Sequence, residues 1–249
     1  MKTGQKRLVQ FGLLAMVAGE FSAAAADVLI LRAVGPSARN YPAGRRVPDT
    51  ASFTLRPGDS VVVLAGGATR TFRGPGTYSA NGAGRSNALA SNATGVRRQT
   101  GAVRGAGDQP VSHPSDVWQT DVTMSGRTCV LAGRRPILWR PSSERAVQLT
   151  ITPQTGAAQT VAWRAGQSTL EWPASIPIVD NASYQISWTG GTSPTRLTAR
   201  TLTAVQPTNL DAVATALVTN QCRGQLDVLI ATRDAEAAAT GGGRGSTPR

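Results

Sequence analysis

The segment from Trp118 to Trp188 constrains the fold more than any other part of the chain. It contains all five tryptophans and the first of the two cysteines, Cys129. Short runs of β-branched, aromatic and aliphatic residues alternate in it with clusters of Gly, Pro, Ser and Asn, which is typical of an antiparallel sandwich. We therefore expect an Ig-like antiparallel β-sandwich over residues 116–205. Its strands are expected at residues 117–122, 128–131, 136–141, 147–151, 161–163, 169–173, 184–188 and 196–202.

Residues 27–80 predict a second, smaller β-domain. Gly66-Gly67 between two apolar runs is typical of a tight hairpin turn, and residues 45–49 are expected to be a loop. The chain as a whole is then mainly β, which fits its 27 glycines and 15 prolines. Strands of this domain are expected at residues 28–31, 52–55, 60–64, 69–73 and 77–78.

Residues 1–26 predict a signal peptide. A basic start precedes an apolar run at residues 8–19, and four alanines at 23–26 suit a cleavage site before Asp27. The apolar run is shorter than the roughly 20 residues that a transmembrane helix needs. No later stretch is long and apolar enough to span a bilayer. We expect a mature protein located in the periplasm or outside the cell.

One turn of the smaller domain resembles a known family. The matching residues are Leu55, Gly58, Asp59, Val61 to Leu64 and Gly66-Gly67. They resemble the periplasmic FecR-like β-domain, in which a Leu-x-x-Gly-Asp turn leads into a strand and a glycine hairpin. The resemblance implies a β-domain architecture for residues 27–80. The family's relay to a sigma factor is not implied, because FecR-type regulators carry a cytosolic segment and a membrane span where this sequence has its signal-like segment.

Export changes the meaning of the two cysteines. In an oxidising compartment, Cys129 and Cys222 predict one disulfide rather than two free thiols. The bridge would join the second strand of the sandwich to the turn between two C-terminal helices. This position does not match the disulfide of antibody domains, because Cys222 lies beyond the sandwich.

Residues 206–238 predict two helices. Apolar residues recur at helical spacing from Leu210 to Val218, and Thr208 or Asn209 can cap that helix. Leu226, Leu229 and Ile230 continue the pattern as a second helix, with a final strand as the alternative. Residues 239–249 form a Gly-rich basic tail that we expect to be disordered.

The net charge of +12 would favour anionic partners, with solubility as the alternative explanation. Residues 81–115 are rich in Gly, Asn, Ser and Arg and predict a linker. Arg97, Arg98 and Arg104 cluster in it as a candidate anion-binding arm. A solvated linker is the favoured interpretation, because no aromatic residues interleave with these arginines as a nucleic-acid surface would require. Nucleic acid is therefore an unexpected partner.

Few residues offer catalytic chemistry. The chain has one histidine, His113, and no lysine after Lys6, which excludes Schiff-base and Ser-Lys chemistry from the mature chain. No Gly-x-Ser-x-Gly elbow is present. We expect no catalytic residue, no cofactor and no metal. A pocket that joined His113 or Glu171 with Asp121 would instead indicate an unrecognised hydrolase.

Calcium is the one metal ion that remains an alternative for this chain. One histidine and two bonded cysteines leave no zinc cluster. Calcium could use carboxylates, although none of them has the spacing of an EF-hand. These carboxylates are Asp59, Asp108, Asp116, Asp121 and Asp180.

Trp118, Trp139 and Trp163 are candidates for a platform that stacks on sugar rings. Strand alternation argues for burial instead, since the arginines that follow two of them, Arg140 and Arg164, would point to the opposite, exposed face. We expect an exported, non-enzymatic interaction or structural protein of the bacterial envelope. Its partner would be another envelope protein or an anionic surface. A glycan- or anion-binding module and an unrecognised hydrolase are the alternatives.

Overall fold

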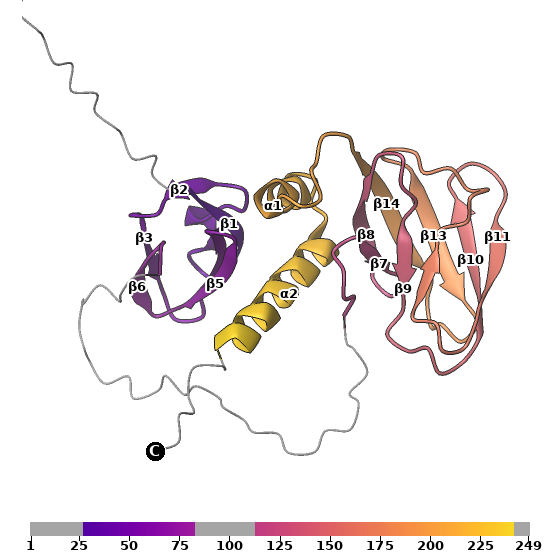
Figure 1. Cartoon of the computed structure of the whole chain (residues 1–249), viewed down its shortest axis with the longest axis horizontal. Helices are drawn as coiled ribbons and strands as arrows, with labels where there is room; N and C mark the ends of the chain where they lie inside the picture. Colours follow the sequence, from indigo (N-terminus) through magenta and orange to yellow (C-terminus); the bar gives the residue numbers. More distant parts are fainter. Residues whose placement is uncertain (1–26, 83–112, 242–249) are drawn as a thin grey trace, which may run out of the picture.

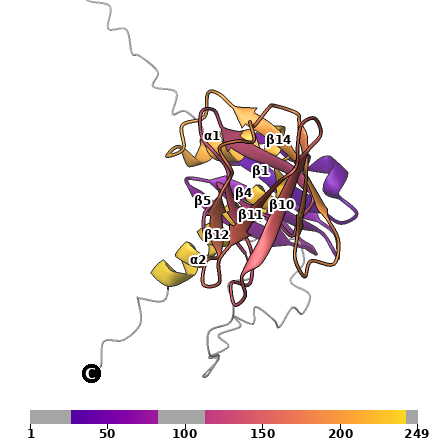
Figure 2. The same ribbon diagram turned by 90° about the vertical axis from the view of Figure 1, so that its right-hand side faces the viewer.

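The computed structural model describes residues 27–82 and 113–241 (Figure 1). The chain is mainly β, with two C-terminal helices, and it has three parts. A small β-domain and a β-sandwich lie at opposite ends, and the helices lie between them (Figure 1). The view from the sandwich end shows the small domain behind the sandwich and the end of α2 projecting beyond both (Figure 2).

The small domain is built on a four-stranded antiparallel sheet in the order β2-β1-β4-β5. Its strands are β1 (Asp27–Val34), β2 (Arg46–Pro48), β4 (Ser60–Ala65) and β5 (Ala68–Arg73), and a second sheet pairs β3 (Ser52–Leu55) with β6 (Gly76–Ser79). A 3-10 turn, η1 (Ala38–Asn40), follows β1. The expected strands are confirmed, but the loop expected at residues 45–49 is wrong. Val47 pairs with Val28 there, so tertiary pairing gives this polar stretch a strand.

Strands β1 and β4 are apolar on both faces because both faces are buried. Ile30 and Val63 point into the domain's own core around Phe53. Leu29 and Leu64 point to the other side, where the C-terminal helices cover the sheet. This two-sided burial explains why both strands are continuous apolar runs rather than alternating ones.

The sandwich contains a five-stranded sheet, β11-β10-β13-β14-β8, and a three-stranded sheet, β12-β9-β7. Leu138, Ile151, Trp163 and Ile186 are buried in the core of the sandwich. Two strand pairs, β14 with β8 and β7 with β9, are parallel, so the sandwich is not purely antiparallel. The strands are β7 (Gln119–Asp121), β8 (Gly126–Leu131), β9 (Ile137–Trp139), β10 (Val147–Pro153), β11 (Gln159–Trp163), β12 (Thr169–Glu171), β13 (Ser183–Trp188) and β14 (Thr195–Leu202).

Both C-terminal elements are helices, α1 (Leu210–Thr219) and α2 (Arg223–Gly241). The Asn209 side chain caps α1 by accepting a hydrogen bond from the N–H of Ala212 at 3.0 Å. The alternative of a final strand is wrong. Helix α2 also continues past the expected boundary at residue 238, and the rest of the expected tail lies outside the described residues.

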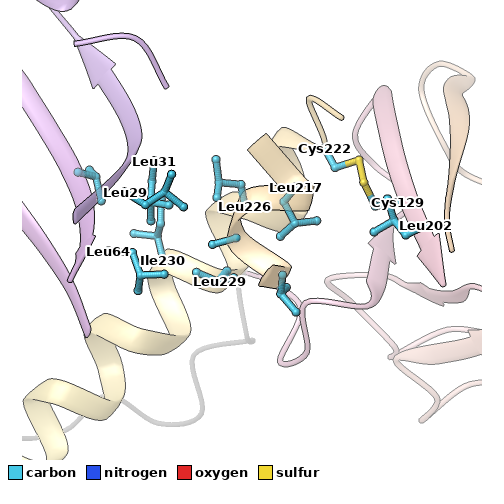
Figure 3. Close-up of a cluster of buried hydrophobic side chains, with 13 residues drawn as sticks. Leu29, Leu31, Leu64, Cys129, Leu202, Leu217, Cys222, Leu226, Leu229 and Ile230 are labelled. Carbon is cyan, nitrogen blue, oxygen red and sulfur yellow. A yellow bond between two sulfur atoms is a disulfide. The ribbon is translucent and has the colours of Figure 1, made fainter. Parts of the chain in front are cut away.

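The helical hairpin forms one core with both β-domains (Figure 3). Leu29, Leu31 and Leu64 reach it from the small domain, and Cys129 and Leu202 reach it from the sandwich. Between them lie buried helix residues, among them Leu217, Leu226, Leu229 and Ile230. The expected disulfide is present and joins Cys129 in β8 to Cys222 between the helices, with their Cα atoms 5.8 Å apart. The hairpin therefore holds the two β-domains together.

Candidate functional site

A hollow of about 730 Å³ lies where the start of α2 meets the side of the sandwich. We call it the β8–α2 hollow. Edge strand β7, the N-terminal half of β8 and the first turns of α2 form its walls. Its lining includes His113, Asp121, Met124, Arg127, Leu197, Arg223, Gln225, Asp227, Val228 and Ala231. This size is within the range of about 300–1,000 Å³ that is common for ligand pockets.

Gln225 closes one end of this hollow. Its Oε1 accepts a hydrogen bond from the N–H of Cys129 at 2.6 Å, and its Nε2 donates to the carbonyl oxygens of Cys129 and Val117, each at 2.9 Å. The side chain is only 4% exposed. Sequence reasoning missed Gln225; its only signal was a polar residue beside the apolar face that begins at Leu226. Its amide supplies the hydrogen bonds that a neighbouring strand would otherwise give to β8.

Two further buried contacts fix β7 and the segment after it against the larger sheet. Thr120 of β7 and Thr128 of β8 share a hydrogen bond of 2.7 Å between their hydroxyl groups. The hydroxyl of Thr195 donates to the carbonyl oxygen of Val122 at 2.7 Å. These contacts join the two sheets of the sandwich along the wall of the hollow, so its shape is built into the fold.

The acidic side chains in the hollow already have structural partners. Asp121 accepts hydrogen bonds from the N–H and the hydroxyl of Thr123, at 2.8 and 2.6 Å. Asp227 forms an ion pair with Arg32 of β1. Within the described parts of the chain, Arg127 and Arg223 form no ion pair. Arg32 therefore balances the charge of Asp227, whereas Asp121 keeps its negative charge. With Arg32 counted, three arginines face two carboxylates around the hollow.

His113, Asp121 and Ser125 line the same hollow, which is the convergence that a hydrolase would need. Their contacts do not form a catalytic array. The Nδ1 of His113 lies 2.9 Å from the carbonyl oxygen of Pro114, and the Ser125 hydroxyl accepts the N–H of Arg196 at 3.0 Å. Among residues 27–82 and 113–241, no hydrogen bond joins any two of the three. A nucleophile and base normally lie within hydrogen-bond reach of each other.

Burial removes two tryptophans from the candidate platform. Trp139 is 4% exposed and Trp163 is 1% exposed, so neither ring offers a face to a ligand. Trp118 is half-buried and packs against the core around the helices. The expected burial of Trp139 and Trp163 is confirmed, but the alternation argument holds only for Trp163, because Arg140 beside Trp139 is buried as well.

The expectation for Arg140 is wrong. Its guanidinium is buried and donates to the carbonyl oxygens of Gln167, Arg145 and Arg164, at 3.0, 2.9 and 2.7 Å. Its Cζ lies 4.8 Å from the centre of the Trp163 ring. Burial lowers the pKa of Arg140 below its ordinary value. Arg140 therefore organises three loop carbonyls inside the sandwich, whereas Arg164 is exposed as expected.

Asp59 has a structural role in the turn that carries the FecR-like resemblance. Its Oδ1 accepts the N–H of Ser37 at 2.8 Å, and its Oδ2 accepts the N–H of Arg56. Burial disfavours the charged carboxylate, but these hydrogen bonds outweigh it and lower the pKa of Asp59. Gly58, at φ 85°, completes the turn, and the N–H of Asp59 donates to the carbonyl oxygen of Arg56 at 3.0 Å.

The other predicted site residues divide into two groups. Glu171 is exposed, as the alternation indicated, and forms an ion pair of 2.9 Å with Arg135. Across the described residues, no group of three or more His, Cys, Asp or Glu side chains could hold a metal ion. The signal segment 1–26 and the arm with Arg97, Arg98 and Arg104 lie outside the described residues, as does Asp108.

Comparison with models of known protein families, with curated proteins and with solved structures gave no match. Within the described residues, neither C-terminal helix is long and apolar enough to cross a bilayer.

Proposed function

We propose that this chain is an exported, non-enzymatic interaction protein of the bacterial envelope. One observation carries the proposal: the Cys129–Cys222 disulfide lies in the core that unites the small domain, the helices and the sandwich. A bridge at this position fits a protein that folds in an oxidising compartment. The basic and apolar segments at residues 1–26, followed by four alanines, support the same route.

An interaction role is supported by how the polar groups are used. The side chains of Gln225, Asp59 and Arg140 each form two or three hydrogen bonds to backbone groups, so they stabilise the backbone rather than a reacting centre. The β8–α2 hollow combines an apolar wall with arginines that lack acidic partners among the described residues. Such a surface suits recognition of a partner better than chemical turnover.

Fractionation of cells that express the full chain tests the export part of this proposal. We expect a processed protein in the periplasm or the medium. Its two cysteines should react with an alkylating reagent only after the disulfide has been reduced. Retention of the unprocessed chain in the cytoplasm with two reactive thiols would contradict the proposal. Crosslinking in intact cells tests the interaction part of the proposal by detecting a stable partner.

Hydrolysis is the second candidate function, because His113, Asp121 and Ser125 line one hollow. A hydrolase should turn over chromogenic esters or peptides, and His113→Ala and Ser125→Ala should each abolish this turnover. We expect no turnover from the wild-type protein. Turnover that both substitutions abolish, while an exposed control such as Ser142→Ala retains it, would favour the hydrolase over the interaction protein.

A further inference from the structure

We propose that the β8–α2 hollow binds an extended polypeptide segment of a partner protein, which pairs with the free edge of β8 and places an acidic side chain beside Arg127 and Arg223. This inference rests on the proposed interaction function and names the class of partner. Strand addition to a sheet edge is a common mode of peptide recognition.

The edge of β8 supplies the first argument. Strand β8 ends the five-stranded sheet, with β14 on its other side. Gln225 satisfies the N–H and C=O of Cys129 on this open side, as a peptide group of a next strand would. Peptide groups of a strand alternate in direction, so those of Arg127 point to the same open side as those of Cys129. Arg127 lines the hollow, and a bound strand would therefore continue the pairing that Gln225 begins.

The apolar wall supplies the second argument. The lining of the hollow includes Leu197 and Val228, which are buried, and Met124, which is 55% exposed. Alternate side chains of an extended peptide point to the same face. One apolar side chain of the peptide would cover these residues. Methionine at a binding rim adapts easily to differently shaped side chains.

Charge supplies the third argument. Arg127 lies on β8, and Arg223 is the first residue of α2, so the two arginines come from different walls of the hollow. Asp227 in the same hollow is paired with Arg32, while Asp121 accepts hydrogen bonds from Thr123 and keeps its charge. A carboxylate on the peptide would meet two guanidinium groups that form no ion pair among the described residues, and arginine binds carboxylates with two parallel hydrogen bonds. An acidic peptide is favoured over a basic one for this reason.

A displayed library of random ten-residue peptides tests this proposal on the oxidised full chain. We expect enriched peptides that contain Asp or Glu next to alternating apolar residues. A synthetic copy of the most enriched peptide should lose roughly tenfold in affinity with Arg127→Ala and with Arg223→Ala, as expected for one lost charge-assisted contact. Arg164→Ala, an exposed arginine on the sandwich outside this hollow, should leave the affinity unchanged.

Filling the hollow provides a second variant. Ala231→Trp places a ring in the hollow, and Ala235→Trp makes the same change at an exposed position of the same helix that does not line it. We expect Ala231→Trp to abolish binding of the synthetic peptide and Ala235→Trp to leave it intact. Both variants are first checked for cooperative unfolding, so that a misfolded protein is not taken as a blocked site.

Backbone pairing is measured separately. Methylating single peptide nitrogens of the selected peptide should abolish binding at alternate positions only. Amide hydrogen exchange at Arg127 should slow when the peptide is bound. Enrichment of no peptide, binding that tolerates Ala231→Trp, or insensitivity to every N-methyl group would overturn the inference. A correctly exported protein that crosslinks to a partner through another surface would overturn this inference and leave the proposed function intact.

Discussion

The side-chain amide of Gln225 hydrogen-bonds to both backbone polar groups of Cys129, at 2.6 Å for the N–H and 2.9 Å for the carbonyl oxygen. Cys129 also carries the disulfide to Cys222, three positions before Gln225. Strand β8 and the start of α2 are thus joined by a covalent bond and by a pair of hydrogen bonds at the same residue. This junction fixes the helices against the sandwich and sets one wall of the β8–α2 hollow.

Replacing Gln225 tests the junction without touching the disulfide. Gln225→Ala leaves the buried N–H and C=O of Cys129, and the carbonyl of half-buried Val117, without these partners. We expect a loss of about 2 kcal/mol in the free energy of unfolding, since an unsatisfied buried polar group costs about 1–3 kcal/mol. Urea unfolding measures it. Gln148→Ala, at an exposed position of β10, is the control and should change stability little. Equal effects of the two substitutions would contradict the role given to Gln225.

The disulfide should be protected in the folded protein. Cys129 is 2% exposed and Cys222 is 0% exposed, so a reductant reaches the sulfurs only when this core opens. We expect the disulfide to be reduced slowly in buffer and quickly in denaturing urea. Titration of the free thiols over time measures both rates. Cys129→Ala with Cys222→Ala should destabilise the protein by at most about 4–5 kcal/mol, the chain-entropy limit for a loop of this order. Rapid reduction of the native protein would contradict the burial.

Arg140 provides a test inside the sandwich. Arg140→Lys keeps the charge but cannot reproduce the planar set of donors that reaches three loop carbonyls. We expect a loss of about 2 kcal/mol in the free energy of unfolding, because three part-buried carbonyls lose hydrogen bonds from a charged donor. The fluorescence of Trp163 should also change, since the guanidinium lies over its ring. The exposed Arg164→Lys is the matched control. An Arg140→Lys variant as stable as Arg164→Lys would show that these contacts contribute little.

Asp59 predicts a pH dependence. Hydrogen bonds from Ser37 and Arg56 hold its folded pKa below the ordinary value of about 3.9. Because the pKa of Asp59 is lower in the folded state, the unfolded state binds the proton first as the pH falls. The contribution of charged Asp59 to the free energy of unfolding is therefore complete above about pH 5 and is lost as the pH falls through the folded pKa. Asp59→Asn should therefore be less stable than wild type near pH 7, and the gap should narrow below about pH 4. A gap that is constant with pH would contradict a charged Asp59 in the turn.

Local signals in the sequence were enough to predict several elements. Gly66 and Gly67 have positive φ values of 57° and 78° in a two-residue hairpin, which matches the turn that their sequence indicates. The Asn209 cap likewise depends on residues within one turn of it. The disulfide was predicted from compartment and cysteine count, which need no knowledge of the fold.

Long-range contacts were not predictable in the same way. Strand β2 exists because Val47 meets Val28, although its own sequence is polar. Strand alternation predicted an exposed Arg140. Its side chain is buried instead, because it hydrogen-bonds to loop carbonyls that include that of Arg164, 24 positions along the chain. The β8–α2 hollow joins β7, β8 and α2, and no spacing in the sequence relates His113 or Arg127 to Arg223. These features arise from tertiary packing, which overrides local pattern.

The central claim is that this chain is an exported scaffold closed by the Cys129–Cys222 bond. The most direct measurement is the intact mass of the protein recovered from the envelope fraction and alkylated without reduction. We predict a chain that begins at Asp27, carries no alkyl group and has the mass of the oxidised form. A chain that retains residues 1–26 and carries alkyl groups on both cysteines would contradict the claim.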